Sequence, residues 1–166
     1  MQTSAEEAAS SYELYTALHR SYRRHPDLFT HGRCTAILTN VMGGRPWSWR
    51  VIGITHAALL SFHNAGYSKV ARDGITRAHI RSRIATTREL LEGERPLSVE
   101  EFARVWIDND KTVLCVRGEN RESLPDFIIF PNTDHDMFQS HQVAWRHGRE
   151  EREFLKLLAI REGIVS

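Results

Sequence analysis

The stretch SVEEFARVWIDNDKTVLCV, residues 98–116, joins a helix signal directly to a strand signal. Ser98, followed three residues later by Glu101, is a capping box in which each side chain bonds the backbone of the other residue. Apolar residues then recur at helical spacing over residues 102–106, which predicts a helix that ends soon afterwards. Residues 112–116 are apolar and rich in β-branched side chains, which favours a strand. The chain therefore needs both helices and a sheet.

The segments on either side give the same mixture of elements. Further helices are predicted between Ser4 and Pro26 and over residues 56–65, 75–91 and 149–161, and further strands over residues 34–39, 47–52 and 127–130. The first two of these strands flank the turn-forming residues 43–46 and are expected to form a hairpin. This order of elements predicts one α+β domain over residues 1–166. A small, mostly antiparallel sheet is expected, flanked by about five helices.

Composition excludes several classes of protein. The chain has 166 residues, of which 41% are hydrophobic and 26% charged, as in an ordinary globular protein. No apolar run approaches the ~20 residues that a membrane helix needs, so no membrane partner is expected. Cys34 and Cys115 are too few for a disulfide framework or a four-cysteine zinc site, and a reduced, cytoplasmic location is expected. The sequence lacks the glycine-rich phosphate-binding motifs, so no nucleotide cofactor is indicated.

The net charge of +1 hides a strong partition along the chain. Residues 1–19 carry a charge of −3, and residues 89–166 carry −6. Residues 20–88 hold twelve Lys and Arg against only Asp27 and Asp73, a balance of +10. A basic segment of this size predicts an anionic partner, and nucleic acid is the preferred candidate.

The type of cation supports that preference. Nineteen of the 22 basic residues are Arg, whose planar guanidinium binds phosphate with two parallel hydrogen bonds and stacks on bases. A general codon bias toward Arg would explain the excess equally well, but it would not explain the lack of acids in the basic segment. The predicted nucleic-acid contacts, which include two tryptophans placed to stack on bases, are Arg45, Trp47, Trp49, Arg50, Arg72, Arg77, Arg81 and Arg83.

A helix over residues 75–91 would array some of these cations. At a spacing of four, Arg77 and Arg81 would share one face of the helix, and His79 and Arg83 the neighbouring face. Such a face suits a phosphate backbone, and the surrounding cations favour the neutral form of His79, which suits a general base. The alternative is a solvated helix face with a partly buried histidine.

Carboxylates near both ends of the strand over residues 112–116 predict a metal site. Asp108 and Asp110 precede this strand and Glu119 follows it, so the three are candidate ligands for Mg²⁺ or another divalent metal. Lys111 is the candidate to stabilise the negative charge that develops on phosphate. With His79, these four residues form the predicted catalytic set. The alternative is a helix C-terminal turn followed by a polar hairpin loop.

Three hypotheses for function follow. The first is a nucleic-acid-processing enzyme, a small nuclease-type phosphodiesterase whose arginine-rich surface binds the backbone. The second is a non-catalytic nucleic-acid-binding or regulatory protein that uses the same surface. The third is a protein-interaction module, in which the basic segment pairs with an acidic partner or with the acidic part of a second copy in a homo-oligomer.

Overall fold

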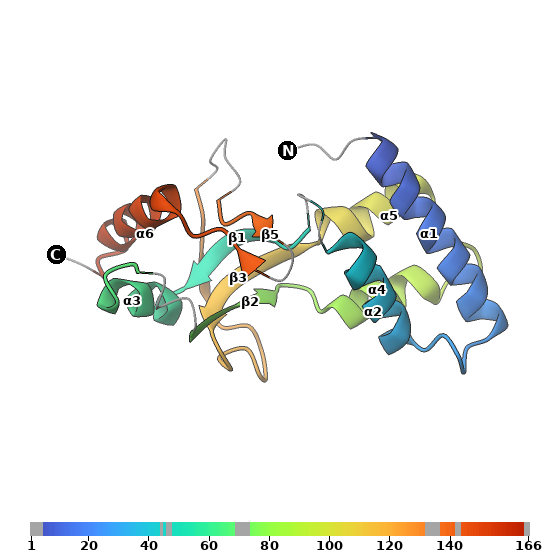
Figure 1. The fold of residues 1–166 in the computed structure, drawn as a ribbon. Coiled ribbons are helices and arrows are strands. Elements are labelled where there is room, and N and C mark those ends of the chain that lie inside the picture. Colours follow the sequence, from blue (N-terminus) through green and yellow to red (C-terminus); the bar gives the residue numbers. More distant parts are fainter. Residues whose placement is uncertain are drawn as a thin grey trace. The chain divides into compact units, whose positions relative to one another are not determined.

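The computed structural model describes residues 5–43, 45, 48–68, 74–131, 137–141 and 144–164 (Figure 1). Internal contacts divide the chain into two units. The helical unit comprises Met1–Ser48 and Arg81–Lys111, and the sheet unit comprises Trp49–Ile80 and Thr112–Ser166. Each unit contains two separate stretches of the chain.

Side-chain caps begin three of the helices in the helical unit. Its elements are α1 (Ala5–Arg24), α2 (His31–Met42), α4 (Arg83–Leu91), α5 (Val99–Phe102) and the π-helical segment η2 (Ala103–Asp108). The hydroxyls of Thr30, Ser82 and Ser98 each accept a hydrogen bond from the backbone N–H three residues later. These bonds satisfy N–H groups that have no partner within the helix. The predicted capping box of Ser98 and Glu101 is present in full.

An aromatic cluster holds the helical unit together. The rings of Tyr15 from α1 and Phe102 from α5 stack with their centroids 4.9 Å apart, and both side chains are fully buried. The Tyr15 hydroxyl donates to the carbonyl of Leu90 at 2.9 Å and accepts from the N–H of Leu97 at 2.8 Å. One buried hydroxyl therefore ties α1 to the end of α4 and to the segment before α5.

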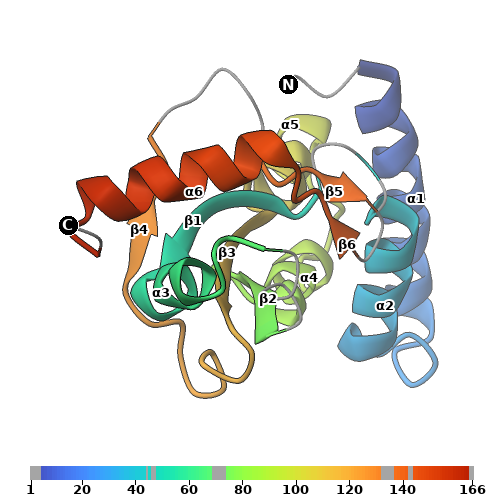
Figure 2. The same ribbon diagram turned by 60° about the vertical axis from the view of Figure 1, so that its left-hand side comes forward.

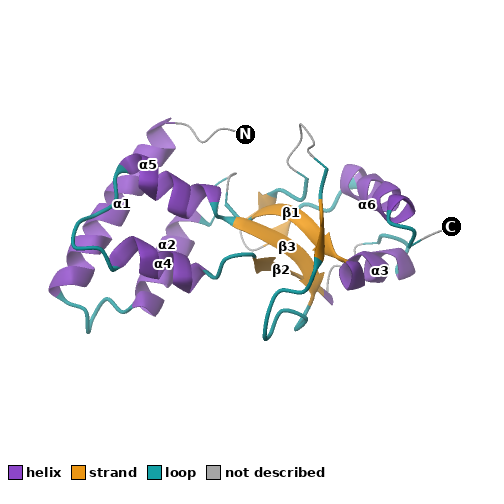
Figure 3. Ribbon diagram, turned by 180° about the vertical axis from the view of Figure 1, so that it is seen from behind, coloured by secondary structure: helices purple, strands orange, loops and turns teal. Residues whose placement is uncertain are grey.

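The sheet unit is built on four strands, β1 (Arg50–Thr55), β2 (Ile75–His79), β3 (Lys111–Val116) and β4 (Phe127–Ile129), in the order β2-β3-β1-β4. The β2–β3 and β1–β4 pairs are antiparallel, and the sheet as a whole is mixed and mostly antiparallel. The helices α3 (His56–Asn64) and α6 (Arg149–Arg161) pack against each other (Figures 2 and 3). They enclose a core with the sheet and with the short pair β5 (Ser140–His141) and β6 (Ala144–Trp145).

Most of the sequence predictions about secondary structure are confirmed. The α+β class, the mostly antiparallel sheet, and the helices α1, α3 and α6 are as expected. Thr55 caps α3 through a hydrogen bond from the N–H of Ala58, and the strands over residues 112–116 and 127–130 form β3 and β4. The expectation that residues 1–166 form one domain stays a prediction.

The predicted strand over residues 34–39 is wrong, because these residues lie within α2. Cys34, Leu38 and Met42 are spaced by four and are buried on one side of that helix, against the same cluster as Tyr15. The gain from burying this stripe outweighs the weak strand preference of the β-branched residues between them. The predicted hairpin with residues 47–52 is wrong for the same reason, although Arg50 does begin β1.

The predicted helix over residues 75–91 is half wrong. Its first part is strand β2, with Ile75 opposite Val116 and His79 opposite Thr112 on β3, and only residues 83–91 form a helix. Ile80 and Ile84, which lie four residues apart and would share one side of such a helix, are both exposed. Pairing with β3, which lies far away in the sequence, overrides the local helical pattern.

None of the helices in the described part of the chain combines the length and apolar character that crossing a bilayer requires. Cys34 and Cys115 are free thiols, and both are fully buried, each in a different unit.

We expect both thiols to resist modification in the folded protein. Burial raises the pKa of the Cys34 thiol. Burial, with a smaller contribution from the charge of Glu119, raises the pKa of Cys115 to about 11. Little reactive thiolate therefore forms at pH 8. Labelling with an aromatic disulfide reagent should be slow in buffer and complete in denaturant. Rapid labelling of either cysteine in buffer would contradict the burial.

The raised pKa of Cys115 also predicts that the free energy of unfolding falls as the pH rises from about 9 to about 11, because the thiol ionises first in the unfolded protein.

Candidate nucleic-acid interface

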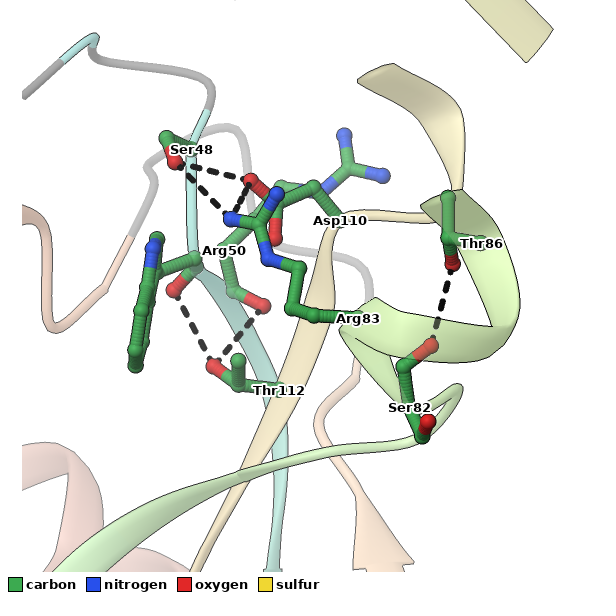
Figure 4. A network of polar contacts seen from close by, with 8 residues as sticks. Ser48, Arg50, Ser82, Arg83, Thr86, Asp110 and Thr112 are labelled. Carbon is green, nitrogen blue, oxygen red and sulfur yellow. Dashed lines mark hydrogen bonds and ion pairs between the residues drawn. The ribbon is translucent and has the colours of Figure 1, made fainter. Parts of the chain in front are cut away.

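The structure brings three of the predicted site residues together in the sheet unit. The Trp49 ring lies with its centroid 4.4 Å from that of His79, and the Arg77 guanidinium lies 4.8 Å from the indole centroid. Trp49 precedes β1, while Arg77 and His79 project from β2 two residues apart, on the same face of the strand. Thr112, opposite His79, donates from its hydroxyl to the Trp49 carbonyl at 3.0 Å, which holds the chain at the start of β1 (Figure 4).

The backbone of Trp49 is in an unusual conformation. Its φ is +60°, in the left-handed region that a large side chain rarely occupies, and Ser48 and Trp49 form a turn rather than a strand. Trp49 is therefore not part of the strand predicted over residues 47–52, and Trp47 lies outside the described residues. Such strain persists only where surrounding contacts enforce it, and it is commonest at functional sites.

The helix face proposed for phosphate binding does not exist. Arg77 is on a strand and is only 9% exposed, so its guanidinium is largely shielded from solvent. Arg81 forms an ion pair with Glu89, and Arg83 begins α4 with its side chain 11% exposed. Of the other predicted contacts, Arg45 is half-buried, Arg50 is exposed, and Arg72 lies outside the described residues.

Asp110, predicted as a catalytic metal ligand, is the centre of a buried polar network in the helical unit (Figure 4). Its Oδ2 accepts from Arg83 Nη2 and from Ser48 Oγ, both at 2.8 Å, and its side chain is fully buried. The Arg83 guanidinium also lies 4.5 Å from the centroid of the Trp106 ring, a cation–π contact. Burial lowers the pKa of Arg83, while the charge and hydrogen bond of Asp110 oppose that shift.

The remaining predicted ligands have separate roles. Glu119, in the sheet unit, accepts from the Thr55 hydroxyl at 2.9 Å and from the N–H of Val116 at 2.8 Å, so it closes the loop that follows β3. Asp108 is exposed at the end of η2, and Lys111 is half-buried at the start of β3. Within the described ranges, no group of three or more His, Cys, Asp or Glu side chains is arranged to hold a metal. The predicted metal site stays a prediction.

Four other arginines are well placed to contact an anion. Arg20, Arg23 and Arg24 lie on the last turns of α1, three and four residues apart, and all are exposed. Arg33 lies on the first turn of α2 and donates from Nη1 to the Leu28 carbonyl at 2.9 Å, so it folds back onto the connecting turn. We call residues 20–33 the α1–α2 corner (Figure 1). It carries four arginines and one acid, Asp27.

Helix stability explains only part of this cluster. Cations at the C-terminus of α1 interact favourably with its dipole, but a cation on the first turn of α2 is unfavourable. The first turn of α2 nevertheless carries Arg33 and no acidic residue. In the described part of the chain, Arg20, Arg23 and Arg24 form no ion pair, unlike Arg81, Arg83 and Arg88.

The charge count places these four arginines in the basic segment, but none of them is among the predicted nucleic-acid contacts. For the three on α1, a favourable interaction with the helix dipole is the simpler interpretation of the sequence. The signal that distinguishes them is Arg33, a cation at the start of a helix, but it becomes visible only when residues 34–39 are recognised as helical. Comparison with known proteins adds no further guidance, because no family model, no curated protein and no solved structure matches this chain.

Proposed function

We propose that this protein binds nucleic acid through the phosphate backbone, using the exposed arginines of the α1–α2 corner. The observation that carries the proposal is a cluster of four exposed arginines, Arg20, Arg23, Arg24 and Arg33, with only one acid among them. One of the four, Arg33, lies on the first turn of α2, where a cation costs stability. Guanidinium groups bind phosphate oxygens in pairs, and the N-terminus of α2 adds partial positive charge at the same corner. Contacts of this kind favour binding without strong base preference.

The contacts of the predicted catalytic residues favour binding over cleavage. Asp110 is engaged by Arg83 and Ser48, and Glu119 by Thr55 and a backbone N–H. A metal bound at either position would have to share the carboxylate with these partners, since Oδ2 of Asp110 and Oε2 of Glu119 each already accept two hydrogen bonds. The non-catalytic hypothesis therefore has more support than the phosphodiesterase, which the same experiment tests.

The salt dependence of binding measures the role of the corner. Four phosphate contacts on duplex DNA give a slope of log K against log salt of about −3.6, or roughly a hundred-fold loss of affinity between 50 and 200 mM salt. The R23A/R24A variant is expected to halve this slope, so that its affinity falls only about ten-fold over the same range. Fluorescence anisotropy with labelled 20-mers of single- and double-stranded DNA and RNA measures both quantities.

The R95A/R104A variant is the matched control. It removes two exposed arginines from the same unit and changes the net charge equally, but neither residue lies in the α1–α2 corner. Equal effects of the two variants would show that only total charge matters, and no binding of any probe would overturn the proposal. Cleavage of the probes in Mg²⁺, abolished by EDTA, would instead support the phosphodiesterase.

A further inference from the structure

Helix α6 carries large apolar side chains on its outer surface. Leu157 is 68% exposed and Ile160 is 60% exposed, although the opposite side of the helix supplies Leu155 and Leu158 to the core of the sheet unit. Neighbouring α3, which packs against α6, exposes Leu60 as well. Single exposed apolar residues are normal, but two of them one turn apart on a charged helix form a surface that a partner can cover.

Opposite charges lie at equal distances on the two sides of Leu157. Glu153 lies four residues before Leu157, and Arg161 lies four residues after it. The two therefore lie about 6 Å along the helix on either side of Leu157, and both fall within about 40° of its direction around the axis. Phe154, partly buried, and Ile160 occupy the corresponding positions three residues on each side.

This pattern is complementary to itself when the helix is reversed. If two copies of α6 pack antiparallel about a twofold axis at Leu157, the leucines meet at the axis, and Glu153 of each copy lies level with Arg161 of the other. Ile160 of each copy likewise lies level with Phe154 of the other. Within one copy Glu153 bonds Lys156 and Arg161 bonds Glu162, at 2.9 and 2.8 Å, so both side chains already lie along the helix surface.

We propose that the exposed face of α6 docks onto the same face of a second copy of this chain, forming an antiparallel, twofold symmetric dimer centred on Leu157. The interface is small, so the dimer is weak and in exchange with the monomer. The paired charges set its register, and the leucines supply its apolar centre. The proposal is independent of nucleic-acid binding, because α6 lies in the sheet unit and carries none of the residues of the α1–α2 corner.

Charge reversal tests the register directly. In E153R and in R161E, both symmetric pairs become like-charged, and we expect the dimer dissociation constant to rise about five- to ten-fold. The double variant E153R/R161E restores opposite charges across the axis and should return the constant close to the wild-type value. Leu157→Lys places two like charges at the axis and should leave only monomer. Sedimentation velocity over a concentration range reaching about 1 mM measures each constant.

Each outcome is decisive. All three positions are exposed, so circular dichroism and thermal unfolding should show folded protein in every variant. Wild-type protein that stays monomeric over the whole range would overturn the proposal. So would a double variant as weak as the single variants, since a dimer formed elsewhere, or an interface with another register, gives no rescue.

Discussion

Asp110→Asn is expected to lower the free energy of unfolding by about 3–5 kcal/mol, because it leaves the charge of Arg83 buried without its counterion. The Asp110 side chain is fully buried and the Arg83 side chain is 11% exposed, so water cannot replace the lost charge. The Asn side chain still accepts from Ser48, which isolates the effect of the charge. Urea unfolding followed by circular dichroism measures the change.

Two further variants test the cause of this loss. Asp108→Asn removes an equal charge from an exposed position two residues earlier, and its effect should stay within about 0.5 kcal/mol. Arg83→Met combined with Asp110→Asn removes both buried charges, and should be more stable than Asp110→Asn alone, because neither charge is then unpaired. Arg83→Met alone completes the cycle. A double variant that loses as much stability as Asp110→Asn and Arg83→Met lose together would show that the ion pair is not the cause.

The same variant separates structure from catalysis. If Asp110 were a catalytic metal ligand, its replacement would abolish cleavage while the protein stayed folded. The network with Ser48 and Arg83 predicts instead a loss of stability, with nucleic-acid binding retained by the fraction that remains folded.

Gly53→Ala is expected to destabilise the protein by about 3 kcal/mol, and Gly53→Val by more. A Cβ at this position on β1 would lie 2.6 Å from the backbone oxygen of Ile128 and 2.8 Å from Cδ2 of Phe127, both on the paired strand β4. The oxygen belongs to the backbone of the sheet, so the clash cannot be relieved by a side-chain rotation alone. Chemical denaturation of the purified variants gives the free energies.

A second glycine provides a control at which alanine is not expected to lower the stability of the protein. Gly32, on the first turn of α2, has no atom within 4 Å of the position its Cβ would take, apart from its chain neighbours and the nearby backbone of its own helix, and its φ is not positive. Gly32→Ala should therefore be neutral or stabilise the protein by up to about 1 kcal/mol, since alanine favours a helix. Equal losses at positions 32 and 53 would contradict the close approach of β1 and β4. Strand propensity alone would predict that Gly53→Val stabilises β1. Only the structure shows that this substitution lowers the free energy of unfolding.

The parts of the fold that could be predicted share a physical basis. Caps such as Ser98 with Glu101, and Thr55, act within three residues, and the apolar strand over residues 112–116 carries its own burial signal. Predictions were wrong where local preference was weak and a distant partner decided the outcome. Residues 75–79 became a strand because β3 pairs with them, and α2 formed because its apolar stripe packs against the cluster that contains Tyr15.

For the candidate site, too, the sequence determines one property, the distribution of charge, and the tertiary structure determines another, the exposure of each arginine. The partition of charge into −3, +10 and −6 is a property of the sequence alone, and the prediction of an anionic partner rests on it. Which of the arginines are available to such a partner is decided by tertiary structure. Arg77 and Arg83 are buried against Trp49 and Asp110, whereas Arg20, Arg23 and Arg24 remain at the surface. The reason is that charge is carried by each residue, while burial and pairing depend on residues that folding brings from elsewhere in the chain.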